Sequence, residues 1–272
     1  MPAVVALVTD FGHADHYVGA VKGAVLVSCP EATVVDIVHE LPAHDVLAGA
    51  YSLAAAYRAF PAGTVFVAVV DPGVGSDRRA LAMDAGGYLF VGPDNGILGL
   101  VLAEHEGARV HEITNALLFA REVSSTFHAR DIFGPVAGHL ARGTPLEAVG
   151  PAVRDPLQLP IAPLRQVGPG EWEAAVLHVD RFGNLITTLT QAGLGAILDT
   201  VDGDPSQLVV IVEGTIMPLT RAYSDVAVGE PCALVGSAGR LEVAVHRGAA
   251  SRLLGAGRGA PVRVRKAFAS RP

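Results

Sequence analysis

The sequence of 272 residues predicts an α/β N-terminal domain with a mainly parallel central sheet, followed by a smaller, all-β and barrel-like C-terminal domain. Three observations lead to this fold class. In the first half, short apolar runs alternate with stretches of helical periodicity. A proline-rich stretch follows, and beyond it short strands recur with glycines between them. We therefore expect an α/β domain over 1–150, a Pro-rich linker over 151–170 and a β-barrel domain over 171–272.

The elements of the N-terminal domain follow from the spacing of apolar residues. Runs of β-branched residues predict strands, and apolar residues that recur every three or four positions predict helices. In chain order, we expect a strand over 4–8, a helix over 16–28, a strand over 33–37, a helix over 44–59, strands over 64–70 and 88–91, a helix over 96–106, a strand over 109–113 and a helix over 132–142. Continuous apolar strands separated by helices indicate a sheet covered on both faces, whose ligands bind beyond the carboxyl ends of the strands.

The second half of the chain has a different pattern. A semi-rigid linker is indicated by five prolines without helical periodicity, namely Pro151, Pro156, Pro160, Pro163 and Pro169. Short apolar runs at regular spacing then predict strands over 173–180, 185–189, 208–212, 232–235, 241–245 and 261–265. Such a pattern is typical of a small β-barrel or sandwich.

The composition excludes several classes of protein. A net charge of −7, from 20 Lys and Arg against 27 Asp and Glu, argues against a binder of nucleic acid or anionic membranes. Apolar residues make up 50% of the chain, but no apolar run approaches the roughly 18 residues of a membrane-spanning helix. The first residues lack the pattern of a signal peptide, so we expect a cytoplasmic protein. The only cysteines, Cys29 and Cys232, are too few for a disulfide framework or a zinc cage.

Carboxylates stand where three of the predicted strands end. Asp10 follows the first strand, Asp71 the third and Asp94 the fourth. A turn or a helix cap is the simpler interpretation of each aspartate alone. Three of them at the ligand-binding edge of one sheet predict a polar site there.

Cationic and imidazole side chains follow in two further segments. Arg78 and Arg79 come after the glycine-rich turn that begins at Asp71, and His128 and Arg130 precede the last predicted helix of the domain. Surface positions are the simpler interpretation of these residues. An Asp, an Arg and a His that meet at strand ends can, however, hold and polarise a water molecule.

A third polar segment lies at the start of the predicted β-barrel domain. Phe182 and Asn184 flank Gly183, which is consistent with an ordinary β-turn. The same pair offers a stacking face and a paired donor and acceptor, which are the groups needed to hold a purine. Both interpretations stay open on local grounds.

Other motifs do not fit. Gly73 and Gly75 are not followed by the Gly-Lys-Ser/Thr of a phosphate loop, and no Gly-x-Ser-x-Gly nucleophile elbow occurs. Acceptable metal ligands are present but without a local ligand pair. A metal-dependent phosphoesterase is therefore an alternative function, with the candidate ligands Asp10, Asp71, Asp94 and His128.

Six motifs in chain order carry a resemblance to a known family. They are Thr9-Asp10-Phe11-Gly12, Asp71-Pro72-Gly73-Val74-Gly75-Ser76 with Arg78-Arg79, Gly92-Pro93-Asp94-Asn95-Gly96, Ser125-Thr126-Phe127-His128-Ala129-Arg130-Asp131, Phe182-Gly183-Asn184 and Gly236-Ser237-Ala238-Gly239. The chain resembles the S-adenosyl-L-methionine (SAM) hydroxide adenosyltransferases, or adenosine-forming SAM hydrolases, which are relatives of the fluorinases and chlorinases. The resemblance covers nearly the full length.

The resemblance implies a reaction and an assembly. In that family, water or hydroxide attacks the ribose 5′ carbon of SAM and gives adenosine and L-methionine, with no metal or organic cofactor. The resemblance also implies a homotrimer, whose active sites lie between the N-terminal domain of one subunit and the C-terminal domain of a neighbour. A SAM- or adenosine-binding module without turnover is a further alternative.

The resemblance assigns roles to individual residues. The water-activating residues are expected to be Asp71, Arg78 and His128. The expected substrate contacts are Asp10 at the ribose hydroxyls, Phe182 and Asn184 at the purine, Ser237 at the methionine end, and Asp94 and Asn95 in the third motif. Ala238 stands where the halogenases have an Arg for the methionine carboxylate.

Hydrolysis is favoured over halogenation. The halogenase relatives have a Tyr-Pro turn where Asp71-Pro72 stands and a Tyr-Ser pair in place of His128-Ala129. An arginine near Asp71 favours the carboxylate form. An ionised Asp71 would repel a halide, so the sequence predicts water as the nucleophile.

Overall fold

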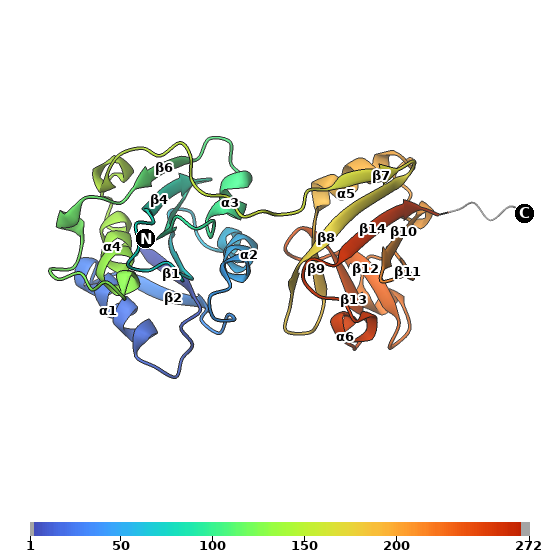
Figure 1. The fold of residues 1–272 in the computed structure, drawn as a ribbon, viewed down its shortest axis with the longest axis horizontal. Helices are drawn as coiled ribbons and strands as arrows, with labels where there is room; N and C mark the ends of the chain where they lie inside the picture. Colours follow the sequence, from blue (N-terminus) through green and yellow to red (C-terminus); the bar gives the residue numbers. More distant parts are fainter. Residues whose placement is uncertain (1–2, 268–272) are drawn as a thin grey trace, which may run out of the picture. The chain divides into compact units, whose positions relative to one another are not determined.

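The computed structural model describes residues 3–267. They form an N-terminal unit that ends at Leu159 and a C-terminal unit that begins at Pro160 (Figure 1). Within the described range, none of the helices combines the length and the apolar character that crossing a membrane would require.

The N-terminal unit is built on a six-stranded sheet with the strand order β2-β1-β3-β5-β4-β6. The strands are β1 (Val4–Thr9), β2 (Thr33–Val38), β3 (Val65–Val69), β4 (Ala80–Ala85), β5 (Tyr88–Pro93) and β6 (Arg109–Glu112). β2, β1, β3 and β5 pair in parallel, whereas β4 is antiparallel to both of its neighbours. The expectation of a mainly parallel sheet was therefore only partly right, because the sheet is mixed.

Strand β4, which the sequence analysis missed, is the source of the difference. β4 and β5 form a hairpin in which Ala85 pairs with Tyr88 across Gly86 and Gly87. Both glycines have positive φ, of 60° and 83°. A two-residue hairpin loop of this kind needs φ > 0 at both positions, which glycine adopts without steric cost. The Gly-Gly pair between two apolar runs was thus a readable hairpin signal.

Four helices cover the two faces of this sheet. They are α1 (Tyr17–Ser28), α2 (Val46–Ala56), α3 (Gly99–Ala103) and α4 (Gly134–Ala141). α1 packs beside α4 on one face, and α2 and α3 lie on the other (Figure 1). α2 begins two residues later than expected because Asp45 is its N-cap and accepts a hydrogen bond from the Ala48 N–H.

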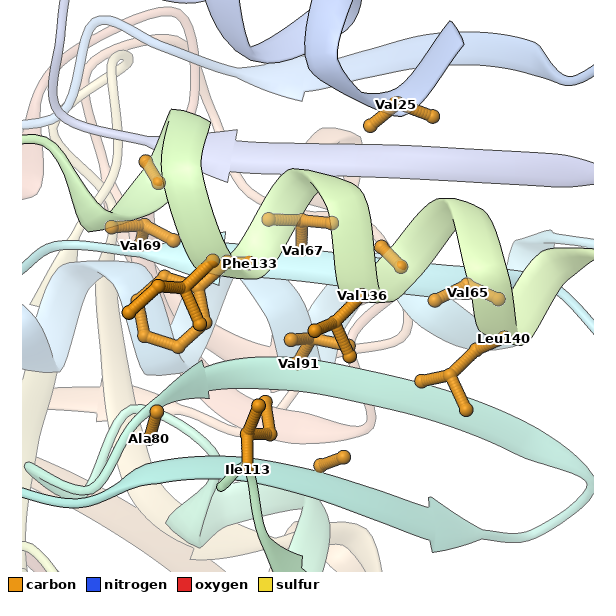
Figure 2. Packing of buried hydrophobic residues seen from close by; sticks show 14 of the residues in the cluster. Val25, Val65, Val67, Val69, Ala80, Val91, Ile113, Phe133, Val136 and Leu140 are labelled. Atoms are coloured by element: carbon orange, nitrogen blue, oxygen red, sulfur yellow. The ribbon is translucent and has the colours of Figure 1, made fainter. Parts of the chain in front are cut away.

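The core on the α4 side consists of alternate strand residues that meet one helix face. Figure 2 shows α4 lying across the sheet, with Phe133, Val136 and Leu140 directed toward strand residues such as Val67 and Val91. These strand side chains are fully buried. The strands are apolar along their whole length because the other face is also covered.

The C-terminal unit is an eight-stranded antiparallel sheet that nearly closes on itself. Its main strand order is β11-β10-β14-β8-β9-β13-β12, and β7 pairs with β8. The strands are β7 (Arg165–Gly168), β8 (Glu171–Val179), β9 (Leu185–Thr190), β10 (Leu208–Val212), β11 (Thr215–Pro218), β12 (Pro231–Val235), β13 (Arg240–Val245) and β14 (Pro261–Lys266). The Thr220 N–H, just beyond β11, donates to the Ala233 carbonyl in β12 and links the two ends of the sheet.

The expectation of an all-β C-terminal domain was only partly right, because the unit also contains helices. It contains α5 (Gln191–Asp199) and the short α6 (Ala250–Leu254). The Thr190 hydroxyl accepts a hydrogen bond from the Gly193 N–H and starts α5, whose Leu194 and Ile197 are buried.

We expect Leu140→Ala to lower the free energy of unfolding by about 2–5 kcal/mol, because it removes a buried side chain and leaves a cavity. Leu140 is 3% exposed, whereas Leu117 is 89% exposed. The matched control Leu117→Ala should change the stability by less than about 0.5 kcal/mol. Urea denaturation followed by circular dichroism measures both, and equal stabilities of the two variants would contradict this packing.

Candidate active site

A cavity of about 320 Å³ opens where the first and third strands of the N-terminal sheet end. Its walls come from the loop after β1, the start of α1, the loop before α2, the end of β3 with the loop after it, and the segment before α4. The lining residues are Asp10, Phe11, Tyr17, Ala43, His44, Val69, Asp71, Val74, Thr126, Phe127, His128 and Ala129. The structure therefore brings Asp10, Asp71 and His128 to one cavity at the edge of the sheet where ligands were expected.

Arg78 joins Asp71 to His128 at this cavity. Its Nε lies 3.1 Å from both carboxylate oxygens of Asp71, and its Nη2 lies 2.5 Å from Oδ2. The same Nη2 lies 2.9 Å from Nδ1 of His128. The side chains of Asp71 and Arg78 are only 5% and 11% exposed. This ion pair is thus shielded from solvent, and salt screens it less than a surface pair.

The contact with Arg78 fixes the protonation pattern of His128. A guanidinium nitrogen can only donate, so Nδ1 of His128 must accept. The proton of the neutral imidazole is then on Nε2. Burial and the Arg78 cation lower the pKa of His128 below its ordinary value, although the Asp71 and Asp131 carboxylates oppose them.

Local backbone features bring the segment that carries Asp71 and Arg78 close to the segment that carries His128. Gly75 has a φ of +79°, and a Cβ at this position would lie 2.3 Å from the Ser125 carbonyl oxygen. Only glycine permits this approach of the β3–β4 loop to the segment that carries His128. A π-helical turn over Ala129–Phe133 follows His128 and leads into α4, a feature that is frequent at functional sites.

Arg130 and Asp131 hold this segment in place. The carboxylate of Asp131 is 2% exposed and accepts hydrogen bonds from the Ser124 N–H and from Arg130. Burial disfavours the ionised form of Asp131, but the contacts with Arg130 and Ser124 outweigh it and lower the pKa of Asp131. Of Arg78, Arg79 and Arg130, the three arginines singled out in the sequence, only Arg78 is hydrogen-bonded to His128 within the described residues.

Asp10 is held by the loop that precedes α2. Its Oδ2 accepts a hydrogen bond of 2.8 Å from the His44 N–H. His44 has a φ of +66°, an uncommon conformation for a residue with a side chain, and it also lines the cavity. In addition, the Gly12 N–H donates to the His39 carbonyl, which ties the two loops together. Asp10 is therefore fixed through one oxygen, and its other oxygen has no protein partner among the hydrogen bonds of the described residues.

The structure does not bring Asp94 and Asn95 to the cavity. Asp94 is 4% exposed, and its carboxylate accepts from Arg79 and from the Leu157 N–H. The Asn95 side chain donates to the Val70 carbonyl and accepts from the Ile97 N–H. Their polar side-chain atoms make contacts within the protein, and the expectation that they bind substrate stays a prediction.

The C-terminal unit has a cavity of about 790 Å³ that is lined by Phe182 and Asn184 among other residues. Phe182 is 74% exposed, whereas Asn184 is buried. Asp180 shapes this turn, because its carboxylate accepts from the N–H groups of Phe182 and Asn184 and from the Asn184 side-chain amide. Ser237 lies in the exposed turn between β12 and β13 and is not among the lining residues.

Sequence reasoning missed the aromatic wall of the N-terminal cavity. The rings of Phe11, Tyr17 and Phe127 lie edge-on or tilted to one another, with centroids 5.2–6.0 Å apart. Phe11 and Phe127 stand inside two of the quoted motifs, and an aromatic residue beside polar site residues was a signal that could have predicted this wall. Tyr17 had no such signal.

The alternative metal site is not assembled. Within residues 3–267, no three His, Cys, Asp or Glu side chains are grouped so that they could hold a metal ion. Asp94, one of the four candidate ligands, is engaged by Arg79 instead.

We predict that neutral His128 carries its proton on Nε2 and that its pKa lies below the ordinary value of about 6.5. His111 is an internal control with the opposite tautomer, because its Nδ1 lies 2.8 Å from the Gly150 carbonyl, which can only accept. Long-range ¹⁵N NMR of the imidazole rings at a pH of about 8 distinguishes the two tautomers. A proton on Nδ1 of His128 would contradict the contact with Arg78.

Comparison with known proteins identifies the family to which the chain is similar. Residues 5–150 match the family model of the SAM hydroxide adenosyltransferase N-terminal domain, and residues 174–263 match that of the C-terminal domain. A crystal structure of a conserved protein from Thermotoga maritima is similar, with a TM-score of 0.88 and 36% identity, covering 96% of this chain and 100% of that one.

Curated relatives extend over nearly the whole chain. The chain is 40% identical to the (R)-S-adenosyl-L-methionine hydrolase of Thermus thermophilus, covering 96% of this chain and 98% of that protein. It is 42% identical to the enzyme of the same name from Salinispora tropica, covering 96% and 97%. A fluorinase from Actinoplanes sp. is 29% identical, covering 90% and 92%. The two matching family models and this coverage show that the chain belongs to the SAM hydroxide adenosyltransferase family.

Proposed function

We propose that this chain hydrolyses SAM at the ribose 5′ carbon and releases adenosine and L-methionine. The observation that carries the proposal is the contact of one guanidinium, that of Arg78, with both Asp71 and His128 at the wall of a cavity. The family and the curated hydrolases support the same activity.

The reaction needs an aligned nucleophile more than it needs an acid. The oxygen of water attacks C5′ while the C5′–S bond breaks, and the electron pair of that bond leaves with sulfur. The sulfonium thereby becomes the neutral thioether of methionine, so the leaving group requires no proton. Holding the water in line with the breaking bond can supply about 7–11 kcal/mol of the barrier at best.

We assign the proton of the attacking water to Asp71. In the neutral ring of His128, Nδ1 already accepts from Arg78 and Nε2 carries the proton, so the ring has no free acceptor. His128 then orients the water by donating from Nε2, and the Asp71 carboxylate accepts the water's proton. Arg78 holds the two groups apart in fixed positions.

The remaining residues supply substrate contacts in this proposal. The free oxygen of Asp10 accepts from a ribose hydroxyl, and Phe182 and Asn184 hold the purine. The aromatic wall around Phe127 suits the sulfonium, since cations are attracted to ring faces. Ser237 contacts the methionine end. No metal or organic cofactor takes part.

The finer parts of the proposal concern assembly and location. We propose a homotrimer in which the C-terminal domain of a neighbouring subunit completes the site, and a cytoplasmic enzyme. The proposed substrate contacts are divided between two cavities, one in each unit, and this division supports the proposal that a neighbouring subunit completes the site.

Incubating the purified protein with SAM and separating the products by chromatography tests the activity. We expect equal amounts of adenosine and methionine, with a rate that a chelator leaves unchanged. A metal-dependent phosphoesterase would lose its activity in chelator, and a binding module would bind adenosine without turnover. Product formation no faster than in buffer alone would contradict the proposed function.

We expect Asp71→Asn to lower kcat by at least about 100-fold, because the amide cannot accept the proton of the water. Adenosine affinity, measured by calorimetry, should change little. Asp77→Asn is the matched control, since Asp77 lies in the same loop and is exposed. The control should keep the wild-type rate. If Asp71→Asn also kept it, Asp71 would have no part in activating the water.

A further inference from the structure

The β3–β4 loop, residues 70–79, carries the Asp–Arg pair of the site, and both of its ends are held by the two residues that follow β5. At the start, the Asn95 side chain donates to the Val70 carbonyl at 2.8 Å. At the end, the Asp94 N–H donates to the Arg79 carbonyl at 2.9 Å. The loop is therefore anchored at each end by a hydrogen bond to the same short segment.

The side chain of Arg79 adds a second anchor at the end of the loop. Its Nε lies 2.7 Å from Oδ2 of Asp94, its Nη1 lies 2.8 Å from Oδ1 of Asp155, and its Nη2 lies 2.9 Å from the Asp155 carbonyl. The other oxygen of Asp94 accepts from the Leu157 N–H. Asp94 is almost fully buried while the Asp155 side chain is 82% exposed, so the inner contact is the less screened of the two.

The anchored carbonyl of Arg79 also touches the catalytic arginine. Nη1 of Arg78 lies 3.5 Å from the Arg79 carbonyl, which is the same oxygen that the Asp94 N–H holds. Because Arg78 immediately precedes Arg79, the position of the Arg79 backbone limits the directions in which the Arg78 side chain can point. A displacement of about 1 Å at a reacting group can cost 10²-fold in rate.

We propose that Arg79 is a positioning residue, which Asp94 and Asp155 clamp so that Arg78 points between Asp71 and His128. The inference rests on the proposed function for its effect on turnover. The planar guanidinium suits this role, because its fixed fork of donors reaches a carboxylate on each side, which a lysine cannot do.

A merely structural role for the clamp makes a different prediction for His128. If the clamp only stabilised the fold, its loss would leave Arg78 beside the imidazole. If the clamp positions Arg78, its loss moves that cation away, while the Asp71 and Asp131 carboxylates stay near the ring. The pKa of His128 then rises toward its ordinary value.

The deciding variant is Arg79→Gln/Asp94→Asn, which removes the cation together with its buried partner and so leaves no unpaired buried charge. Its matched control is Arg109→Gln/Asp84→Asn. Arg109 and Asp84 form another Arg–Asp ion pair, at 2.6 Å, between β6 and β4, and it is more exposed than the Arg79–Asp94 pair. We expect the deciding variant to lose at least about tenfold in kcat with little change in KM, and its His128 titration, followed by NMR, to move to higher pH. The control should keep the wild-type kcat and titration.

The two readouts separate the possible failures. A wild-type protein that does not hydrolyse SAM overturns the proposed function, and the His128 titration still tests the clamp. A deciding variant that matches its control in kcat and in titration overturns the clamp. If the deciding variant does not fold, Arg79→Lys takes its place. A lowered kcat together with a raised pKa of His128 supports the clamp, and wild-type values of both overturn it.

Discussion

One guanidinium sets the chemistry of the N-terminal cavity. Arg78 contacts the Asp71 carboxylate and Nδ1 of His128 from a nearly buried position. It thereby holds a carboxylate and an imidazole side by side, and its charge disfavours a second positive charge on the imidazole. The glycine that lets the β3–β4 loop approach and the π-helical turn before α4 both serve to bring the partners of this arginine within reach.

Three aspartates that look alike in the sequence have three different environments. Asp10, Asp71 and Asp94 each follow a strand, and their common placement at one edge of the sheet could be predicted from the apolar runs before them. The partner of Asp71 is close in the sequence, but the partners of Asp10 and Asp94 include residues 34 and 63 positions away, which spacing does not reveal. Asp10 is held by His44 and Asp71 by Arg78, whereas Asp94 is held by Arg79 and by the Leu157 backbone.

The fold was predicted best where a local pattern decides the structure. Buried parallel strands and long helices have clear periodicities, and β1, β3 and α1 lie close to their expected positions. β4 was missed because its apolar run carries few β-branched residues, and α5 because it is a short helix among strands. Direction within a sheet depends on pairing, which an apolar run does not reveal.

The reversed direction of β4 has a consequence for how this site can diversify. β3 ends and β4 begins at the same edge of the sheet, so the loop between them never has to cross to the other edge, as a connection between parallel strands would. Between its anchored ends, and apart from Gly75, this loop can therefore change in sequence without altering the register of any strand. Residues at the wall of the cavity can in this way vary while the strands that carry the loop keep their pairing.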